Sequence, residues 1–214
     1  MTRQFQPTDP IRLYSNDELC RFFIEAPKYE YLPYWRSKFF LVRFILGTGL
    51  RVSEVLRVRV PEDANMEGIV TVRISKNGRA RKCKVSPELE PHYLQRIRMS
   101  EPGSLFPGVT NTRTLERWHD EAMAVCGIEK RVGRCCHALR HQFATEELNS
   151  ERLPVWKVSR QLGHSSDRIT LDTYTHCLVA RMYGDKIPKW WALAARHNNL
   201  RALENVGCLN LTSN

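Results

Sequence analysis

The hydrophobic pattern of this 214-residue chain switches from a helical period to a period of two and back again, and this switch limits the folds open to it. Residues 68–75 alternate and are rich in β-branched side chains, Asn77-Gly78 is a typical hairpin turn, and a second strand is expected near 80–85. On both sides of this segment apolar residues recur at helical spacing. The sequence therefore predicts a mainly α domain with a small antiparallel β-hairpin or sheet, an α+β fold.

Capping residues and glycines predict where the helices begin and end. Ser15 followed by Glu18 is a capping box, Pro33 suits a first helical turn, and Gly47-Thr48-Gly49 ends the helix that Pro33 opens. Asn111-Thr112 and Pro154 mark two further starts. The expected helices cover residues 16–26, Pro33 to Gly47, 51–58, 87–99, 112–126, 134–149, 154–162, 167–176 and 188–204.

The composition favours an anionic partner. Lys and Arg number 33 against 23 Asp and Glu, a net charge of +10, which points first to nucleic acid and second to an acidic membrane surface. A basic protein without such a partner is the alternative. The seven cysteines form no C-x-x-C pair, so we expect reduced thiols and no zinc ribbon. We expect no secretory signal and no membrane-spanning segment, because no apolar stretch is long enough.

The segment Thr48-Gly49-Leu50-Arg51-Val52-Ser53-Glu54 places an arginine after a glycine turn, at the start of a short helix. The forked guanidinium of Arg51 could hold a phosphate through two donors. Arg51 and Glu54 could equally form a simple ion pair at i and i+3.

The hairpin contains a cluster of positive charge, since five of the nine residues from 76 to 84 are basic. Such a hairpin can lie along a phosphate backbone, or its charges can protect an edge strand from aggregation. Its basic residues are Lys76, Arg79, Arg81, Lys82 and Lys84.

In a helix, His137, Arg140 and His141 share one face at i, i+3 and i+4. A His-Arg-His face on an otherwise apolar helix is costly unless it lines a site, although a surface stripe is the alternative. A zinc site made of Cys135, Cys136 and these histidines fails on ligand spacing.

Two more candidates lie near the C-terminus. Gly163 ends a helix and presents His164 in a turn, and Tyr174 follows ten residues later on another helix. A lone tyrosine is far more often a core residue than a nucleophile, so Tyr174 gains weight only together with the other segments.

Together these segments resemble the catalytic domain of the tyrosine recombinases, also called phage-type integrases. The resemblance covers roughly residues 14–178, and the order and spacing of the motifs match that family's pattern. It rests on Thr-Gly-Leu-Arg51-Val-Ser-Glu54, the hairpin Lys76, His137-x-x-Arg140-His141, Leu-Gly-His164 and Leu-Asp-Thr-Tyr174-Thr-His.

The resemblance implies a metal-free and ATP-free reaction, with no cofactor, in which Tyr174 attacks a DNA phosphate and forms a 3′-phosphotyrosine. Arg51 and Arg140 would bind the scissile phosphate, and His164 would donate to one of its oxygens. His137 is then the candidate general base and Lys76 the general acid, with Arg79 and Lys82 as neighbours that could be confused with it. Glu54 and His141 are expected to support the site, and Arg79, Arg81, Lys82 and Lys84 to contact DNA.

The resemblance also implies an organisation and a set of partners. We expect an N-terminal lead-in at 1–13, a tyrosine recombinase catalytic domain at 14–178 that stands alone, and a C-terminal helix and tail at 179–214. This last segment would dock on a neighbouring protomer or pack on its own domain. The expected partner is double-stranded DNA, bound by a homotetramer on two sites, with a monomer or dimer when free, in a prokaryotic cytoplasm close to the nucleoid.

The expected function is site-specific recombination or integration, as in a mobile genetic element. Two alternatives are an enzyme like the type IB topoisomerases, which shares the chemistry but relaxes supercoils as a monomer, and a DNA-binding regulator that has kept the fold and lost catalysis.

Overall fold

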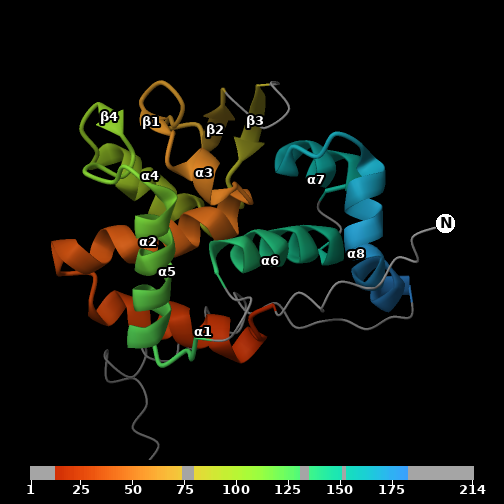
Figure 1. Ribbon diagram of the computed structural model, residues 1–214, viewed down its shortest axis with the longest axis horizontal. Helices are drawn as coiled ribbons and strands as arrows, with labels where there is room; N and C mark the ends of the chain where they lie inside the picture. The colour runs from red at the N-terminus through yellow and green to blue at the C-terminus, as the bar shows by residue number, and fades with distance from the viewer. Residues whose placement is uncertain (1–12, 74–79, 131–134, 151–152, 183–214) are drawn as a thin grey trace, which may run out of the picture.

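Helices form most of the structure, with two small antiparallel sheets on one side (Figure 1). The computed structural model describes residues 13–73, 80–130, 135–150 and 153–182, with side chains as far as residue 174. The helices are α1 (Asn16–Glu25), η1 (Ala26–Lys28), α2 (Pro33–Thr48), α3 (Val52–Val55), α4 (Glu90–Arg98), α5 (Thr112–Val125), α6 (Cys136–Asn149), α7 (Val155–Leu162) and α8 (Asp167–Met182). The strands are β1 (Arg59–Val60), β2 (Ile69–Val72), β3 (Arg81–Lys84) and β4 (Gly103–Ser104).

Helix α2 is the centre of the larger hydrophobic core. Every residue from Lys38 to Thr48 is buried, and α2 packs against α4, α5 and α6. Pro33 occupies its first turn, and Gly49 ends it in the left-handed conformation with φ 67°. Both boundaries were predicted from the sequence, and the buried face explains why the apolar residues of this helix cover almost its whole circumference.

The predicted hairpin strands are confirmed as β2 and β3. They pair antiparallel, with Val70 opposite Cys83 and Val72 opposite Arg81. Val70, Val72 and Cys83 are buried, so one face of the ribbon closes the core. The predicted turn at Asn77-Gly78 lies outside the described residues.

The second sheet was not predicted. Strands β1 and β4 pair through Arg59 with Ser104 and Val60 with Gly103. Two residues per strand are too few to show a period of two, which is why the sequence pattern gave no sign of them.

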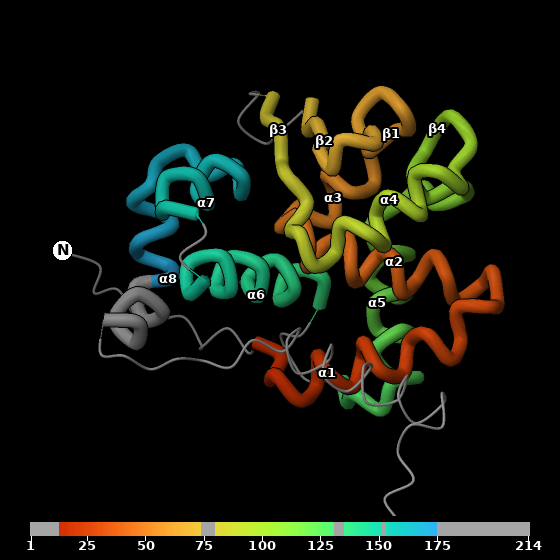
Figure 2. Tube along the Cα trace, turned by 180° about the vertical axis from the view of Figure 1, so that it is seen from behind, coloured from red at the N-terminus to blue at the C-terminus, as the bar shows by residue number. Residues whose placement is uncertain are grey.

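A smaller apolar cluster joins α6, α7 and α8, and Tyr174 belongs to it together with Phe143 and Leu162. Helix α6 packs against both α2 and α8, so it connects the two cores (Figure 2). Helix α8 continues to Met182, beyond the predicted end at 176 and across the expected domain boundary at 178/179. Pro154 caps α7 rather than standing in its first turn. The helix expected at 188–204 lies outside the described residues.

The structure also bears on membrane insertion. No described helix combines the length and the apolar character that crossing a membrane requires.

Replacing Gly49 with alanine should destabilise the fold more than the same change at Gly108. Both glycines have positive φ, 67° and 76°, which costs a non-glycine residue about 1 kcal/mol or more. A β-carbon at position 49 would also overlap the buried ring of Phe143, whereas one at position 108 would meet nothing within 4 Å. We expect Gly49→Ala to lower the free energy of unfolding by about 3 kcal/mol and Gly108→Ala by about 1 kcal/mol. Urea denaturation followed by circular dichroism measures both, and equal losses would contradict the packing argument.

Candidate active site

Arg51 follows the turn that ends α2 and takes an extended backbone, φ −70° and ψ 147°, as the N-cap of α3. Its backbone N–H donates to Glu54 Oε2 at 2.9 Å, and its Nη1 donates to Glu54 Oε1 at 3.2 Å. The ion pair considered as an alternative therefore exists. This ion pair leaves other N–H donors of Arg51 available for a ligand, and the Arg51 side chain is 29% exposed.

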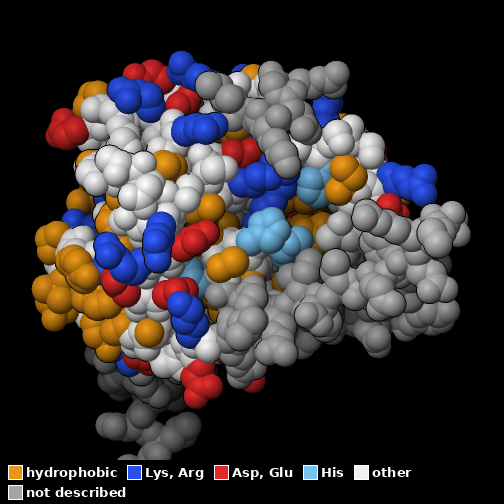
Figure 3. All heavy atoms as spheres, viewed as in Figure 1, with side chains coloured by type: hydrophobic (Ala, Val, Ile, Leu, Met, Phe, Trp, Pro, Cys, Tyr) orange, Lys and Arg blue, Asp and Glu red, His pale blue; other side chains and the backbone are white. Residues whose placement is uncertain are grey.

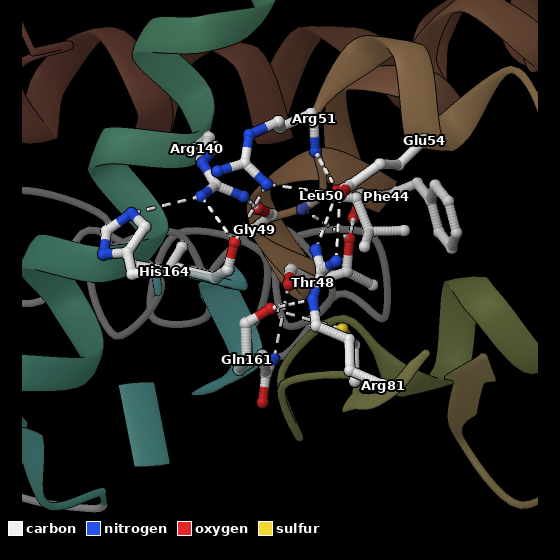
Figure 4. A network of polar contacts seen from close by, with 12 residues as sticks. Phe44, Thr48, Gly49, Leu50, Arg51, Glu54, Arg81, Arg140, Gln161 and His164 are labelled. Carbon is white, nitrogen blue, oxygen red and sulfur yellow. Dashed lines mark hydrogen bonds and ion pairs between the residues drawn. The ribbon is translucent and has the colours of Figure 1, made fainter. Parts of the chain in front are cut away.

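Arg140 reaches the same place from α6 and is almost fully buried. Its Nη1 donates to Gly49 O at 2.6 Å and its Nη2 donates to Leu162 O at 2.7 Å. Arg51 Nη1 also donates to Leu162 O, at 3.3 Å. The two predicted arginines thus meet at the last carbonyl of α7, the negative end of a helix (Figure 4).

His164 stands directly after Gly163, which ends α7 with φ 69°. Its Nε2 lies 3.3 Å from Arg140 Nη2, and its Nδ1 lies 2.7 Å from Thr170 Oγ1. Because a guanidinium only donates, Nε2 accepts and the proton of the neutral ring resides on Nδ1. Burial, followed by the positive charges of Arg140 and Arg51, lowers the pKa of His164 to about 4.

The face predicted for α6 is confirmed in its geometry. His137 and His141 pack edge to face, with ring centres 4.4 Å apart, on the same helix as Arg140. His137 is exposed, yet loss of water around the ring, followed by the charges of Arg140 and Arg51, lowers its pKa. Histidine and basic side chains lie side by side on the face shown in Figure 3.

Tyr174 joins this group through His141. The phenolic oxygen lies 2.6 Å from His141 Nδ1, and the side chain is only 2% exposed. Negative charge on the phenol would raise the pKa of Arg140, so the two groups are electrostatic neighbours. The backbone at Tyr174 leaves the helical conformation, with φ −118° and ψ 15°, which puts a kink within α8.

Glu54 is the carboxylate that holds this part of the site together. Both of its oxygens accept from Arg81, at 2.9 and 2.7 Å, in a forked pair that is largely buried. Burial alone would raise the pKa of Glu54, but the hydrogen bonds from Arg81 and Arg51 outweigh it and bring that pKa below its usual range. Sequence reasoning had assigned Glu54 a supporting place beside Arg51 and had missed its partner in β3.

The basic hairpin residues divide between two environments. Arg81 turns inward, where its Nε also donates to Gln161 O at 2.9 Å, whereas Lys82 and Lys84 are exposed. Arg81 was expected to contact DNA; in the structure its Nε, Nη1 and Nη2 each donate one hydrogen bond within the protein. Lys76 and Arg79 lie outside the described residues.

Gln161 was not singled out from the sequence. Its buried side-chain amide donates to Lys84 O at 2.8 Å and to Thr48 O at 3.3 Å. It therefore joins the end of α7 to β3 and to the turn before Arg51. Gln161 falls on the same face of α7 as Val158 and Leu162, and a polar residue on that apolar face was the signal that could have indicated this role.

A shared metal ion would require several ligand side chains grouped together. Across the described ranges, no three His, Cys, Asp or Glu side chains are grouped so as to hold a metal ion.

Comparisons with known proteins agree with this geometry. Residues 16–181 match the model of the phage integrase family. Tyrosine recombinase XerA of Pyrococcus furiosus is 33% identical over 136 residues, which are 59% of this chain and 46% of the relative. Tyrosine recombinase XerD of Shewanella oneidensis is 31% identical over 155 residues, 66% of this chain and 50% of the relative. The chain thus spans about half the length of these curated relatives.

Two solved structures share the fold. The crystal structure of XerA recombinase superposes with a TM-score of 0.66 at 27% identity, covering 87% of this chain and 68% of that one. The XerH site-specific recombinase, solved in a post-cleavage complex with its difH substrate, gives a TM-score of 0.64 at 19% identity, covering 82% and 53%. The second likeness concerns the fold alone.

Lowering the pH should destabilise this protein before its carboxylates titrate. The pKa of His141 is lowered to about 3 and those of His164 and His92 to about 4, from an ordinary 6.5, in each case chiefly by burial. Below pH 6.5 these histidines bind protons in the unfolded chain but remain neutral in the folded chain. The stability present above that pH is therefore lost as the pH falls toward 4. Each such histidine contributes at most about 1.4 kcal/mol per pH unit.

Melting temperatures measured from pH 7.5 to pH 5 test this expectation. His141→Phe should flatten the profile, because it removes one of the titrating groups. A melting temperature that stays constant over this range would contradict it.

Proposed function

Because this chain belongs to the phage integrase family, we propose that it forms the catalytic domain of a site-specific DNA recombinase that works through a 3′-phosphotyrosine. The observation that carries the proposal is the meeting of Tyr174 with Arg51, Arg140, His141 and His164 in one cluster. Residues 14–178 are the proposed catalytic domain. Its substrate is double-stranded DNA, in keeping with the net charge of +10.

The two arginines suit a phosphodiester because their charges are incompletely balanced. Burial, followed by the charge of Arg51, lowers the pKa of Arg140 to about 10. An anion placed between the two guanidinium groups relieves this repulsion. Their remaining donors then hold the non-bridging oxygens, where charge accumulates in the transition state of phosphoryl transfer. His164 contributes a third donor once the phosphate raises its affinity for a proton.

In the proposed reaction Tyr174 Oη attacks phosphorus in line with the bond to the 5′ oxygen. The Oη–P bond forms, the P–O5′ bond breaks, and the number of phosphate ester bonds is unchanged, so rejoining requires no ATP. The phenolic proton passes to a histidine. The leaving 5′ oxygen takes a proton from Lys76, the general acid that the family resemblance implies. The charges that stabilise the phosphate are side chains, and no metal enters the scheme.

The choice of histidine follows from contact. Sequence reasoning proposed His137 as the general base, but the phenol contacts His141 Nδ1. With its pKa near 3, His141 is neutral at pH 7, and in one tautomer Nδ1 accepts the phenolic hydrogen. We assign His141 to holding the buried phenol and keep His137, exposed beside it, as the base when Tyr174 turns toward the phosphate. The kink at Tyr174 is the point of α8 at which this rotation occurs.

Arg81 acts through Glu54 in this proposal rather than through DNA. Its fork fixes Glu54, which in turn fixes the backbone and side chain of Arg51. Lys82 and Lys84, exposed on β3, remain the proposed DNA contacts of the described hairpin, with Arg79 beyond it.

The wider assembly follows the family expectation. We propose a homotetramer on two DNA sites, with residues 179–214 docking on a neighbour, and a monomer or dimer in the absence of DNA. The proposed setting is a prokaryotic cytoplasm, in contact with the nucleoid.

A covalent trap tests the nucleophile. A suicide substrate nicked beside the scissile phosphate should leave wild-type protein covalently attached to DNA, whereas Tyr174→Phe should bind DNA and form no adduct. Tyr31→Phe is the matched control, because Tyr31 is 71% exposed and should react like wild type. Absence of an adduct with wild type would favour a silent DNA-binding regulator. Relaxation of supercoils by a monomer, without exchange between two sites, would favour a topoisomerase.

Arg140→Lys should separate catalysis from binding. Lysine keeps the charge but loses the fork that contacts two oxygens, so cleavage should fall by a factor of about 100 or more while DNA affinity changes little. Arg117→Lys, on an exposed face of α5, is the control and should leave cleavage unchanged. Adduct formation is timed by gel electrophoresis and affinity is measured by fluorescence anisotropy. Wild-type cleavage by Arg140→Lys would remove Arg140 from the proposed mechanism, provided that melting temperatures match.

A further inference from the structure

A second cluster of arginines lies outside the candidate active site, where α4 packs against α2. In Figures 1 and 2 α4 stands at the opposite end of the molecule from α7 and α8. Here a cavity of about 230 Å³ opens, several times the roughly 30 Å³ that one water occupies. Its lining, which we call the α2–α4 pocket, consists of Glu30, Arg36, Phe40, Arg43, His92, Gln95, Arg96 and Met99.

Arg43 is the most unusual member of this pocket, because it is only 4% exposed and lies in the part of α2 in which every residue is buried. Its Nη1 pairs with Glu30, but its Nε and Nη2 have no hydrogen-bond partner among the described residues. The faces of Phe22 and Phe23 support the guanidinium, whose carbon lies 5.9 and 5.5 Å from their ring centres. Buried N–H groups of a charged side chain are costly when they lack an acceptor, and the described residues supply none for these two.

Two further arginines complete the positive lining. Arg96 donates through Nη2 to Leu105 O, while its buried Nε has no partner among the described residues. Arg36 donates through Nε to Glu30 O at 3.2 Å, which leaves its terminal donors for another group. Burial lowers the pKa of Arg96, and the charge of Arg36 lowers it further.

The charges of the pocket select the kind of ligand. Three guanidinium groups face one carboxylate, Glu30, which leaves two positive charges in excess. His92 adds none at neutral pH, because burial and then the charge of Arg43 lower its pKa to about 4. A dianion would neutralise the excess, and arginine forks match the geometry of tetrahedral oxyanions.

We propose that the α2–α4 pocket binds a small dianionic oxyanion of the phosphate class, held between Arg36, Arg43 and Arg96. The ligand is inorganic phosphate or the end of a phosphate monoester rather than the backbone of DNA, since a phosphodiester carries a single charge. The site is separate from the Arg51–Arg140 cluster and does not depend on the function proposed for that cluster.

The test must exclude phosphate bound at the candidate active site, so it uses the full-length chain carrying Arg51→Gln. Inorganic phosphate, titrated calorimetrically at constant ionic strength, should bind this protein saturably and raise its melting temperature. Adding Arg36→Gln or Arg96→Gln should weaken that affinity at least tenfold. Adding Arg98→Gln, an exposed arginine at the end of the same α4, should leave the affinity unchanged.

The chemical class is tested in parallel. Sulfate should compete with phosphate, whereas dimethyl phosphate and acetate, each with one negative charge, should bind at least tenfold more weakly. Equal binding of dimethyl phosphate would overturn the preference for a dianion and point to a DNA backbone. Equal stabilisation by sodium chloride, or undiminished affinity in both pocket variants, would overturn the site itself.

Selenate diffused into crystals of the unsubstituted protein gives an independent measurement, which does not depend on whether the variants fold. The anomalous peak of selenium should lie between Arg36, Arg43 and Arg96. Peaks confined to other positions would overturn the proposal.

Discussion

Three guanidinium groups converge on the carbonyl end of α7, and the shape of the candidate active site depends on this contact. Arg81 donates to Gln161 O, while Arg51 and Arg140 both donate to Leu162 O. The last carbonyls of a helix lack partners within the helix and carry partial negative charge, so they attract cations. The three arginines come from β3, the α3 cap and α6. The end of α7 is the common contact that positions these elements relative to one another.

Bringing like charges together is energetically unfavourable, and the lowered pKa values of Arg140 and His164 reflect this cost. The pKa of Arg140 is lowered to about 10 and that of His164 to about 4, in both cases by burial and then by neighbouring positive charge. Glu54 offsets part of this charge, yet its two oxygens are already shared between Arg51 and Arg81. The cluster therefore retains an excess of positive charge, which suits it to the anion that the proposed reaction brings to it.

The side chains of this site could be predicted from the sequence, whereas the backbone atoms that hold them could not. Arg51 and Arg140 were predicted, because a glycine turn and a helical face mark them locally. Their shared acceptor, Leu162 O, is a backbone atom that any residue at this position would supply, so no sequence pattern predicts it.

Arg81 shows a different limit. It was grouped with the outward hairpin lysines because it is basic, although its strand partner Val72 is buried. Residues directly opposite in an antiparallel pair point to the same face, so the register would have placed Arg81 inward. The pairing of β1 with β4 could not be predicted, because two residues per strand show no period.

The position of Tyr174 links the smaller core to the proposed chemistry. Its ring packs with Phe143 and Leu162 and its hydroxyl meets His141, so the phenol is withheld from solvent while the arginines remain open at Arg51. In the proposed reaction the phenol attacks only after leaving this apolar cluster, and contacts that DNA makes elsewhere on the protein would supply the free energy for that step. The backbone at Tyr174 departs from the helical conformation, so the proposed movement would begin at a kink that α8 already contains. In the proposed reaction, binding of DNA and exposure of the phenol form one coupled equilibrium, so cleavage would follow only the correct docking of a site.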